Sequence, residues 1–151
     1  MVFRILVATD GSGYANKAAD YAGLLAKKIG DAEITVLGVV DTAVIAQAMV
    51  HPSAMSATLF DELEQVASEA VKDTQQRLSW TGKEVTARVE RGGPAPIICD
   101  VAERGHFDLI VMGASGHGRI ADILLGSVSD KVLHKALVPV LIVRTKEGHQ
   151  K

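Results

Sequence analysis

The sequence of 151 residues lacks several features that define large classes of proteins. It has one cysteine, Cys99, which excludes an internal disulfide, and its apolar neighbours favour a small buried side chain over a reactive thiol. Its apolar runs are short and interrupted, so none resembles a membrane span or the apolar core of a secretion signal. A net charge of −2 offers no basic surface for nucleic acid. We therefore expect a cytoplasmic protein that binds neither membranes nor nucleic acid.

Common catalytic motifs are also missing. No lysine follows a glycine at the spacing GxxxxGK[ST] of a phosphate-loop NTPase. The segment 113–117, GASGH, departs from the GxSxG nucleophile elbow at its last position. The segment 116–121 fits the dinucleotide fingerprint GxGxxA, but it follows the fourth predicted strand instead of the first, with little chain after it. We interpret that match as accidental.

Apolar runs and helical patterns alternate regularly along the chain. Its length and composition, with 48% hydrophobic and 23% charged residues, are typical of a single globular domain over 1–151, with a flexible tail at 146–151. The predicted strands are 3–9, 33–40, 84–91, 108–112 and 140–144. The first predicted helix is capped by Ser12 and ended by Gly30, and the others are 58–80, 95–104 and 127–137. This alternation predicts an α/β protein, a parallel sheet between two layers of helices.

The hydrophobic content of the strands predicts their order. Strands one, two and four are almost continuously apolar, as expected for strands buried on both faces, whereas the third alternates and fits an edge. The five-stranded order 3-2-1-4-5 satisfies both observations. In that order the chain winding reverses between strands one and four, and open α/β sheets bind ligands in the crevice at such a point.

Two helices have predicted inner faces, and one connection is unusually long. On the first helix the apolar stripe is Tyr14, Ala18, Tyr21, Ala22, Leu25 and Ile29. On the second it is Leu59, Leu63, Val66, Ala70 and Leu78. The connection 41–56 is longer than most loops, and the sequence leaves open whether it is a lid, a partner surface or a mobile link.

A glycine-rich stretch follows the fourth strand and predicts a phosphate site. Glycines at 113, 116 and 126 would let the backbone approach a ligand closely. Ser127 and Asp130 have capping-box spacing, which predicts a helix beginning at Ser127. The start of a helix presents free N–H groups and positive potential to an anion. Spacing alone fits an ordinary loop and a capped helix equally well.

The motif Gly113-x2-Gly116-x9-Gly126-Ser127 resembles that of the ATP-binding branch of the universal stress protein family. The resemblance includes IVMG before the motif, VSDKVL and VPVLIV after it, and VATDGS near the N-terminus, and it covers essentially the whole chain. It implies the same sheet order, an adenine nucleotide alpha-hydrolase-like fold, and an ATP-binding protein of stress response or regulation.

The resemblance also assigns roles to residues. It implies that Asp10 contacts the nucleoside, that the backbone of Val39 meets the adenine edge, and that Met112 lines the ribose. It implies phosphate contacts at Gly116 and at 126–129. The nucleotide-binding positions that we predict are Ala8, Asp10, Val39, Met112, Gly113, Gly116, His117, Gly118, Gly126, Ser127, Val128 and Ser129.

Partners and activity follow from the same reasoning. We expect Mg²⁺ or Mn²⁺ to arrive with the phosphates of ATP. No residue resembles a poised general base, and no phosphate-loop lysine is present, so we expect a regulatory switch with at most slow ATP hydrolysis instead of an enzyme. The apolar run 140–143 (Val140, Leu141, Ile142 and Val143) and the family resemblance favour a homodimer through the fifth strand. The downstream protein partner is not indicated.

Two other functions stay open on sequence grounds. One is a dimeric interaction module of the same fold that binds no nucleotide, although that branch of the family typically lacks the spaced glycines. The other is a flavin or nicotinamide binder, which would give a coloured protein or respond to those cofactors.

Overall fold

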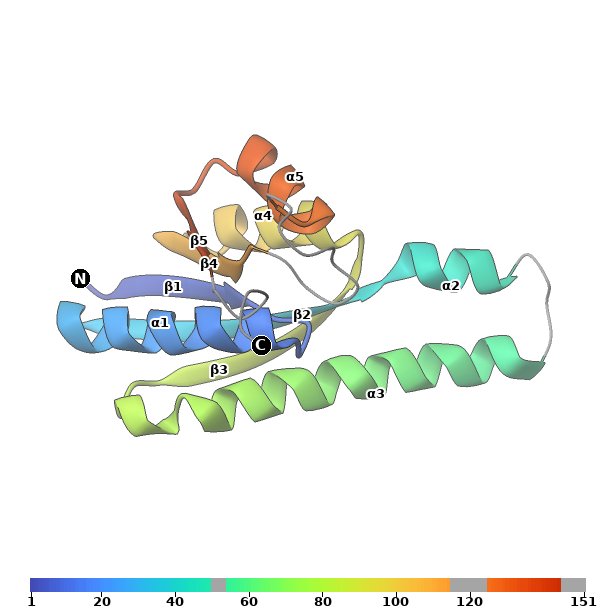
Figure 1. Ribbon diagram of the computed structural model, residues 1–151, viewed down its shortest axis with the longest axis horizontal. Coiled ribbons are helices and arrows are strands. Elements are labelled where there is room, and N and C mark those ends of the chain that lie inside the picture. Colours follow the sequence, from blue (N-terminus) through green and yellow to red (C-terminus); the bar gives the residue numbers. More distant parts are fainter. Residues whose placement is uncertain (50–53, 115–124, 145–151) are drawn as a thin grey trace, which may run out of the picture.

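The computed structural model describes residues 1–49, 54–114 and 125–144 (Figure 1). Strands and helices alternate along the chain. They are β1 (Phe3–Ala8), α1 (Gly13–Ile29), β2 (Ala32–Asp41), α2 (Thr42–Met49), α3 (Ala54–Arg77), the 3₁₀ turn η1 (Ser79–Thr81), β3 (Val85–Gly92), α4 (Pro94–Arg104), β4 (Leu109–Gly113), α5 (Ser127–Lys135) and β5 (Val140–Val143). Within the described ranges, no helix is both long enough and apolar enough to cross a membrane.

The five strands form one parallel sheet of order β3-β2-β1-β4-β5, which confirms the predicted topology. The central strand β1 pairs with β2 on one side and β4 on the other, so that Val7 lies opposite both Val36 and Val111. The alternating strand β3 is an edge, as its pattern predicts, and β5 is the other edge.

Alternate residues of the strands pack into two separate cores. Ile5 and Val7 belong to the core beneath α1 and α3. Leu6 and Ala8 belong to the core beneath α4 and α5. Figure 1 shows α1 and α3 on one side of the sheet and α4 and α5 on the other. The period of two along a strand divides each strand between the two helical layers.

The predicted apolar stripe of α1 is only partly correct. Ala18 and Ala22 are buried as predicted, but Tyr21 and Ile29 are 44% and 42% exposed. The buried face consists of small residues, Ala15, Ala18, Ala19, Ala22, Gly23 and Ala26. Small side chains let the helix lie close to its neighbours: a Cβ on Gly23 would be 2.9 Å from a methyl carbon of Leu78. The helix start and end agree with prediction, because Ser12 is the N-cap and Gly30 the C-cap.

The prediction of a long loop over 41–56 is wrong for its described residues. They contain all of α2 and the beginning of α3, and Figure 1 shows both helices extending beyond the end of the sheet. The predicted inner face of α3 also needs correction, because Val66 is 59% exposed, whereas Val71 and Thr74 are buried. The predicted tail, 146–151, lies outside the described residues.

Candidate functional site

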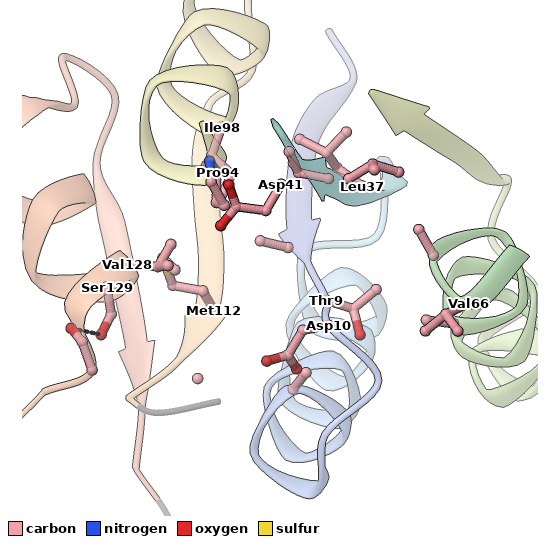
Figure 2. Close-up of a pocket in the computed structure, with 18 of the residues that line it drawn as sticks. Thr9, Asp10, Leu37, Asp41, Val66, Pro94, Ile98, Met112, Val128 and Ser129 are labelled. Atoms are coloured by element: carbon pink, nitrogen blue, oxygen red, sulfur yellow. Dashed lines mark hydrogen bonds between the residues drawn. The ribbon is translucent and has the colours of Figure 1, made fainter. Parts of the chain in front are cut away.

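A cavity of about 750 Å³ opens at the carboxyl ends of the strands, where β1 stops and the winding of the sheet reverses. Its volume lies within the range of small-molecule pockets. Figure 2 shows Met112 and Val128 on one side of the cavity, Thr9 and Asp10 at the end of β1, and Val66 of α3 on the far side. The predicted crevice between the first and fourth strands is therefore present, and it extends past β1 to α3.

The cavity collects most of the residues predicted to bind nucleotide. The predicted residues that line it are Ala8, Asp10, Val39, Met112, Gly113, Gly126, Ser127, Val128 and Ser129. The other three, Gly116, His117 and Gly118, lie outside the described residues. Further lining residues, which no sequence motif indicated, belong to α3 and α4, and one charged lining residue, Asp41, belongs to β2. Asp41 follows Val39 by two positions, so the period of the strand could have placed both on the same face.

The loop after β1 is held by its own side chains. Ser12 donates its backbone N–H to Oδ1 of Asp10 at 2.9 Å, and its own Oγ accepts the N–H of Ala15 at 3.2 Å. Gly11 has a φ of +83°, a conformation that favours glycine. These bonds satisfy donors at the start of α1 and fix Asp10 at the edge of the cavity.

Glycine at position 113 has a steric cause. A Cβ on Gly113 would lie 2.8 Å from the carbonyl oxygen of Tyr14, in the first turn of α1. The end of β4 therefore fits against α1 only without a side chain. The next residue, Ala114, anchors the start of α5: its carbonyl oxygen accepts the N–H of Gly126 at 2.7 Å and the Oγ–H of Ser129 at 2.9 Å.

The start of α5 differs from the predicted capping box. Its N-cap is Gly126, in extended conformation, and no side chain caps it. Ser127 is the first helical residue, and its side chain is exposed. The Oγ of Ser129 is buried and lies within hydrogen-bond distance of two carbonyl oxygens, those of Ala114 and Gly126. Asp130 donates its backbone N–H to the carbonyl oxygen of Gly126, and its carboxylate lies 3.7 Å from Nδ1 of His134.

The other helix starts that line the cavity have fewer available N–H groups. Ser12 caps α1. In α2, the N–H of Ala43 donates to Oδ1 of Asp41 at 2.9 Å. In α4, Pro94 and Pro96 lie in the first turn and have no N–H. The hydrogen bonds occupy N–H groups that an anion could otherwise use, and the prolines remove others.

The start of α5 has three N–H groups for which the described residues provide no acceptor. The N–H groups of Ser127, Val128 and Ser129 have no acceptor among the described residues, while the fourth, that of Asp130, donates to Gly126. These three amides and the positive end of the helix dipole point to the same place, which is the arrangement that binds anions at helix starts. Of the helix starts around the cavity, that of α5 is the best suited to a phosphate.

The opposite part of the cavity offers a strand edge. The N–H of Thr9 donates to the carbonyl of Leu37 at 2.9 Å, so the peptide groups of Leu37 point toward β1. Val39 lies two residues further on and points its N–H and C=O in the same direction, but β1 has already ended at Ala8. No described residue pairs with that N–H. Val39 thus presents one donor and one acceptor to the cavity.

The charged side chains that line the cavity within the described ranges are both acidic, Asp10 and Asp41. No group of three His, Cys, Asp or Glu residues in those ranges could hold a metal ion. Most other lining side chains are apolar, and they include Met112, Pro94 and Ile98. The cavity therefore combines an apolar interior, an acidic rim and one anion-binding helix start.

Sheet order and the position of the cavity define an α/β protein of the adenine nucleotide alpha-hydrolase-like fold. The chain matches the universal stress protein family over residues 1–144. It is 35% identical to a universal stress protein of Methanocaldococcus jannaschii over an alignment of 142 residues. That alignment covers 93% of this chain and 81% of the relative. The chain belongs to the universal stress protein family.

Solved structures of the family resemble the fold closely. Universal stress protein UspA from Lactobacillus plantarum superposes with a TM-score of 0.79 at 26% identity, covering 94% of this chain and 97% of its own. A universal stress protein crystallised in complex with cAMP superposes with a TM-score of 0.69 at 27% identity, covering 93% of this chain and 96% of its own. An adenine nucleotide thus binds to at least one relative of this fold.

Proposed function

We propose that this protein binds an adenine nucleotide, ATP, in the cavity at the carboxyl ends of β1 and β4, and that it acts as a regulatory binding protein. The observation that carries the proposal is the start of α5, where three N–H groups have no acceptor among the described residues. Phosphate oxygens would accept those N–H groups. The family relative crystallised with cAMP supports the choice of an adenine nucleotide.

The base has a matching place at the other side of the cavity. The Watson–Crick edge of adenine carries an acceptor, N1, beside a donor, the exocyclic amine, and Val39 offers the complementary N–H and C=O. Met112 and Ile98 supply apolar surface for the ring. Asp10, at the rim, can accept a hydrogen bond from a hydroxyl group of the ribose. A nucleotide in this orientation places its phosphates toward Ser127.

The charges favour binding over catalysis. A triphosphate is strongly anionic, and the charged side chains that line the described part of the cavity are acidic. Mg²⁺ or Mn²⁺ carried by the phosphates would offset this repulsion, with oxygen ligands from the phosphates themselves. His117 and Arg119, two basic residues of the glycine-rich stretch, lie outside the described residues. Because no described lining residue is a lysine or arginine that could stabilise a departing phosphate, we propose at most slow hydrolysis.

We also propose a homodimer through β5. All four residues of the strand, Val140–Val143, are apolar and half-buried, and β5 is an edge of the sheet. The carbonyls of Pro139 and Val143 accept N–H groups of β4 and the residue after it. Val140 and Ile142 therefore point their own peptide groups away from β4, where the edge strand of a second copy could pair with them.

The proposed function is tested by isothermal titration calorimetry with ATP, ADP, AMP, cAMP and adenosine, with and without Mg²⁺. We expect one site per chain, and we expect affinity to rise from adenosine to the phosphorylated ligands. Saturating ATP should also raise the melting temperature by mass action. Absence of binding to every one of these ligands would overturn the proposal and favour the nucleotide-free interaction module.

A further inference from the structure

We propose that Asp41 determines base specificity, its carboxylate accepting a hydrogen bond from the exocyclic amine of adenine. This inference rests on the proposed function, because it requires the base to lie against Val39. Asp41 lies outside the glycine-rich motif and outside the positions predicted from it. The backbone geometry of β2, the position of the carboxylate and the apolar surface near it support the inference independently.

The direction of β2 brings the amine toward Asp41. Within one residue of a strand, the C=O lies on the C-terminal side of the N–H. If N1 of adenine accepts the N–H of Val39, its amine pairs with the C=O and lies further along β2. The next residue of β2 whose side chain lies on the same face of the sheet as that of Val39 is Asp41, the last residue of the strand. The amine has two hydrogens, of which Val39 takes one.

One carboxylate oxygen of Asp41 is available to accept a hydrogen bond from a ligand. Figure 2 shows its side chain beside Pro94 and directed into the cavity that it lines. Its Oδ1 accepts the N–H of Ala43 at 2.9 Å, which caps α2 and fixes the side chain. Its Oδ2 has no hydrogen-bond partner among the described residues. The remaining oxygen is therefore a fixed acceptor that matches the second hydrogen of the amine.

The surroundings make that acceptor selective. Pro94 and Ile98 of α4 also line the cavity, where Figure 2 shows them near Asp41, and Ile98 is buried. A base held against these side chains would shield Oδ2 of Asp41 from water. If the base had no amine to donate to it, that oxygen would be left without a hydrogen bond. A base with a carbonyl in place of the amine, such as hypoxanthine, would bring two acceptors together. Sites built around a hydrogen bond reject ligands that lack its partner, because the buried group is left unpaired.

The substitution Asp41→Asn distinguishes this role from a structural one. Asparagine retains an oxygen to cap α2, and it replaces the other acceptor with an NH₂ donor. We expect the ratio of the Kd values for ITP and ATP to fall in this variant by roughly ten- to hundredfold, the effect of one hydrogen bond to a charged group. The melting temperature without nucleotide should stay close to that of the wild type, because the cap remains.

The control is Asp31→Asn, which makes the same change next to the other end of β2, where the carboxylate is 70% exposed. It should leave the ratio unchanged. Calorimetry with ATP and ITP on all three proteins separates the possible failures. If the wild type binds ATP but Asp41→Asn leaves the ratio unchanged, the role of Asp41 is wrong and the proposed function stands. If the wild type binds neither nucleotide, the proposed function fails, and the inference fails with it.

Discussion

Replacing Ser127 with proline removes one proposed phosphate donor while leaving the helix intact. Ser127 is the first residue of α5, a position that proline favours because its N–H makes no bond within the helix. The preceding residue, Gly126, has a ψ of 165°, in the extended region that a residue before proline requires. The variant should therefore fold as well as the wild type.

The expected loss can be estimated from the single donor removed. A hydrogen bond to a charged partner contributes roughly 1.5–3 kcal/mol. At about 1.4 kcal/mol per factor of ten, Ser127→Pro should weaken ATP binding roughly ten- to hundredfold. Adenosine, which has no phosphate, should bind the variant and the wild type equally.

The matched control is Ser127→Ala, which removes the exposed hydroxyl and keeps the backbone N–H. Calorimetric titration of both variants with ATP and adenosine compares the amide with the side chain directly. If Ser127→Pro binds ATP as tightly as Ser127→Ala, the amide at position 127 does not contact phosphate. A parallel loss of adenosine binding would show that the substitution had disturbed the whole cavity.

Three further predictions concern packing and assembly. Gly113→Ala should lower the free energy of unfolding by about 1–3 kcal/mol in urea titrations, because its Cβ would meet the backbone of α1; Gly93→Ala, whose Cβ would have only an ordinary 3.4 Å contact, should change it far less. Ser129→Ala should cost about 1 kcal/mol and lower the melting temperature by about 2–4 °C, since a buried hydroxyl loses its carbonyl partners; an unchanged melting temperature would contradict this. Ile142→Pro should give a folded monomer by light scattering with a native circular dichroism spectrum. Leu141→Pro, whose peptide N–H points toward β4, should unfold the sheet. A dimeric Ile142→Pro protein would argue against pairing through β5.

The sequence predicted the sheet because hydrophobic content reports directly on burial. The almost continuously apolar strands β1, β2 and β4 lie inside the sheet, and the alternating strand β3 lies at an edge. The fifth strand, β5, is apolar throughout but lies at the other edge, so apolar content alone does not place it. The helices were less predictable. Tyr21 and Ile29 extended a predicted apolar stripe on α1, yet both are partly exposed. The helix packs through alanines instead, because small side chains let it lie close to the sheet.

The candidate site was predictable in position but not in detail. Spacing placed the start of the helix at Ser127, as observed, but it could not show that Gly126 is the N-cap, because serine and glycine both cap helices. It could not show that Gly113 faces the backbone of Tyr14, a contact between distant parts of the chain. Nor did spacing reveal α2, whose eight residues, TAVIAQAM, include no charged side chain.

The most direct test of the phosphate site is the ¹H–¹⁵N correlation spectrum of the protein titrated with ATP and with adenosine. We predict that ATP shifts the amide resonances of Ser127, Val128 and Ser129, and that adenosine leaves them in place while shifting that of Val39. If ATP binds but leaves those three amides unperturbed, the phosphates lie elsewhere, and the start of α5 is not the anion site.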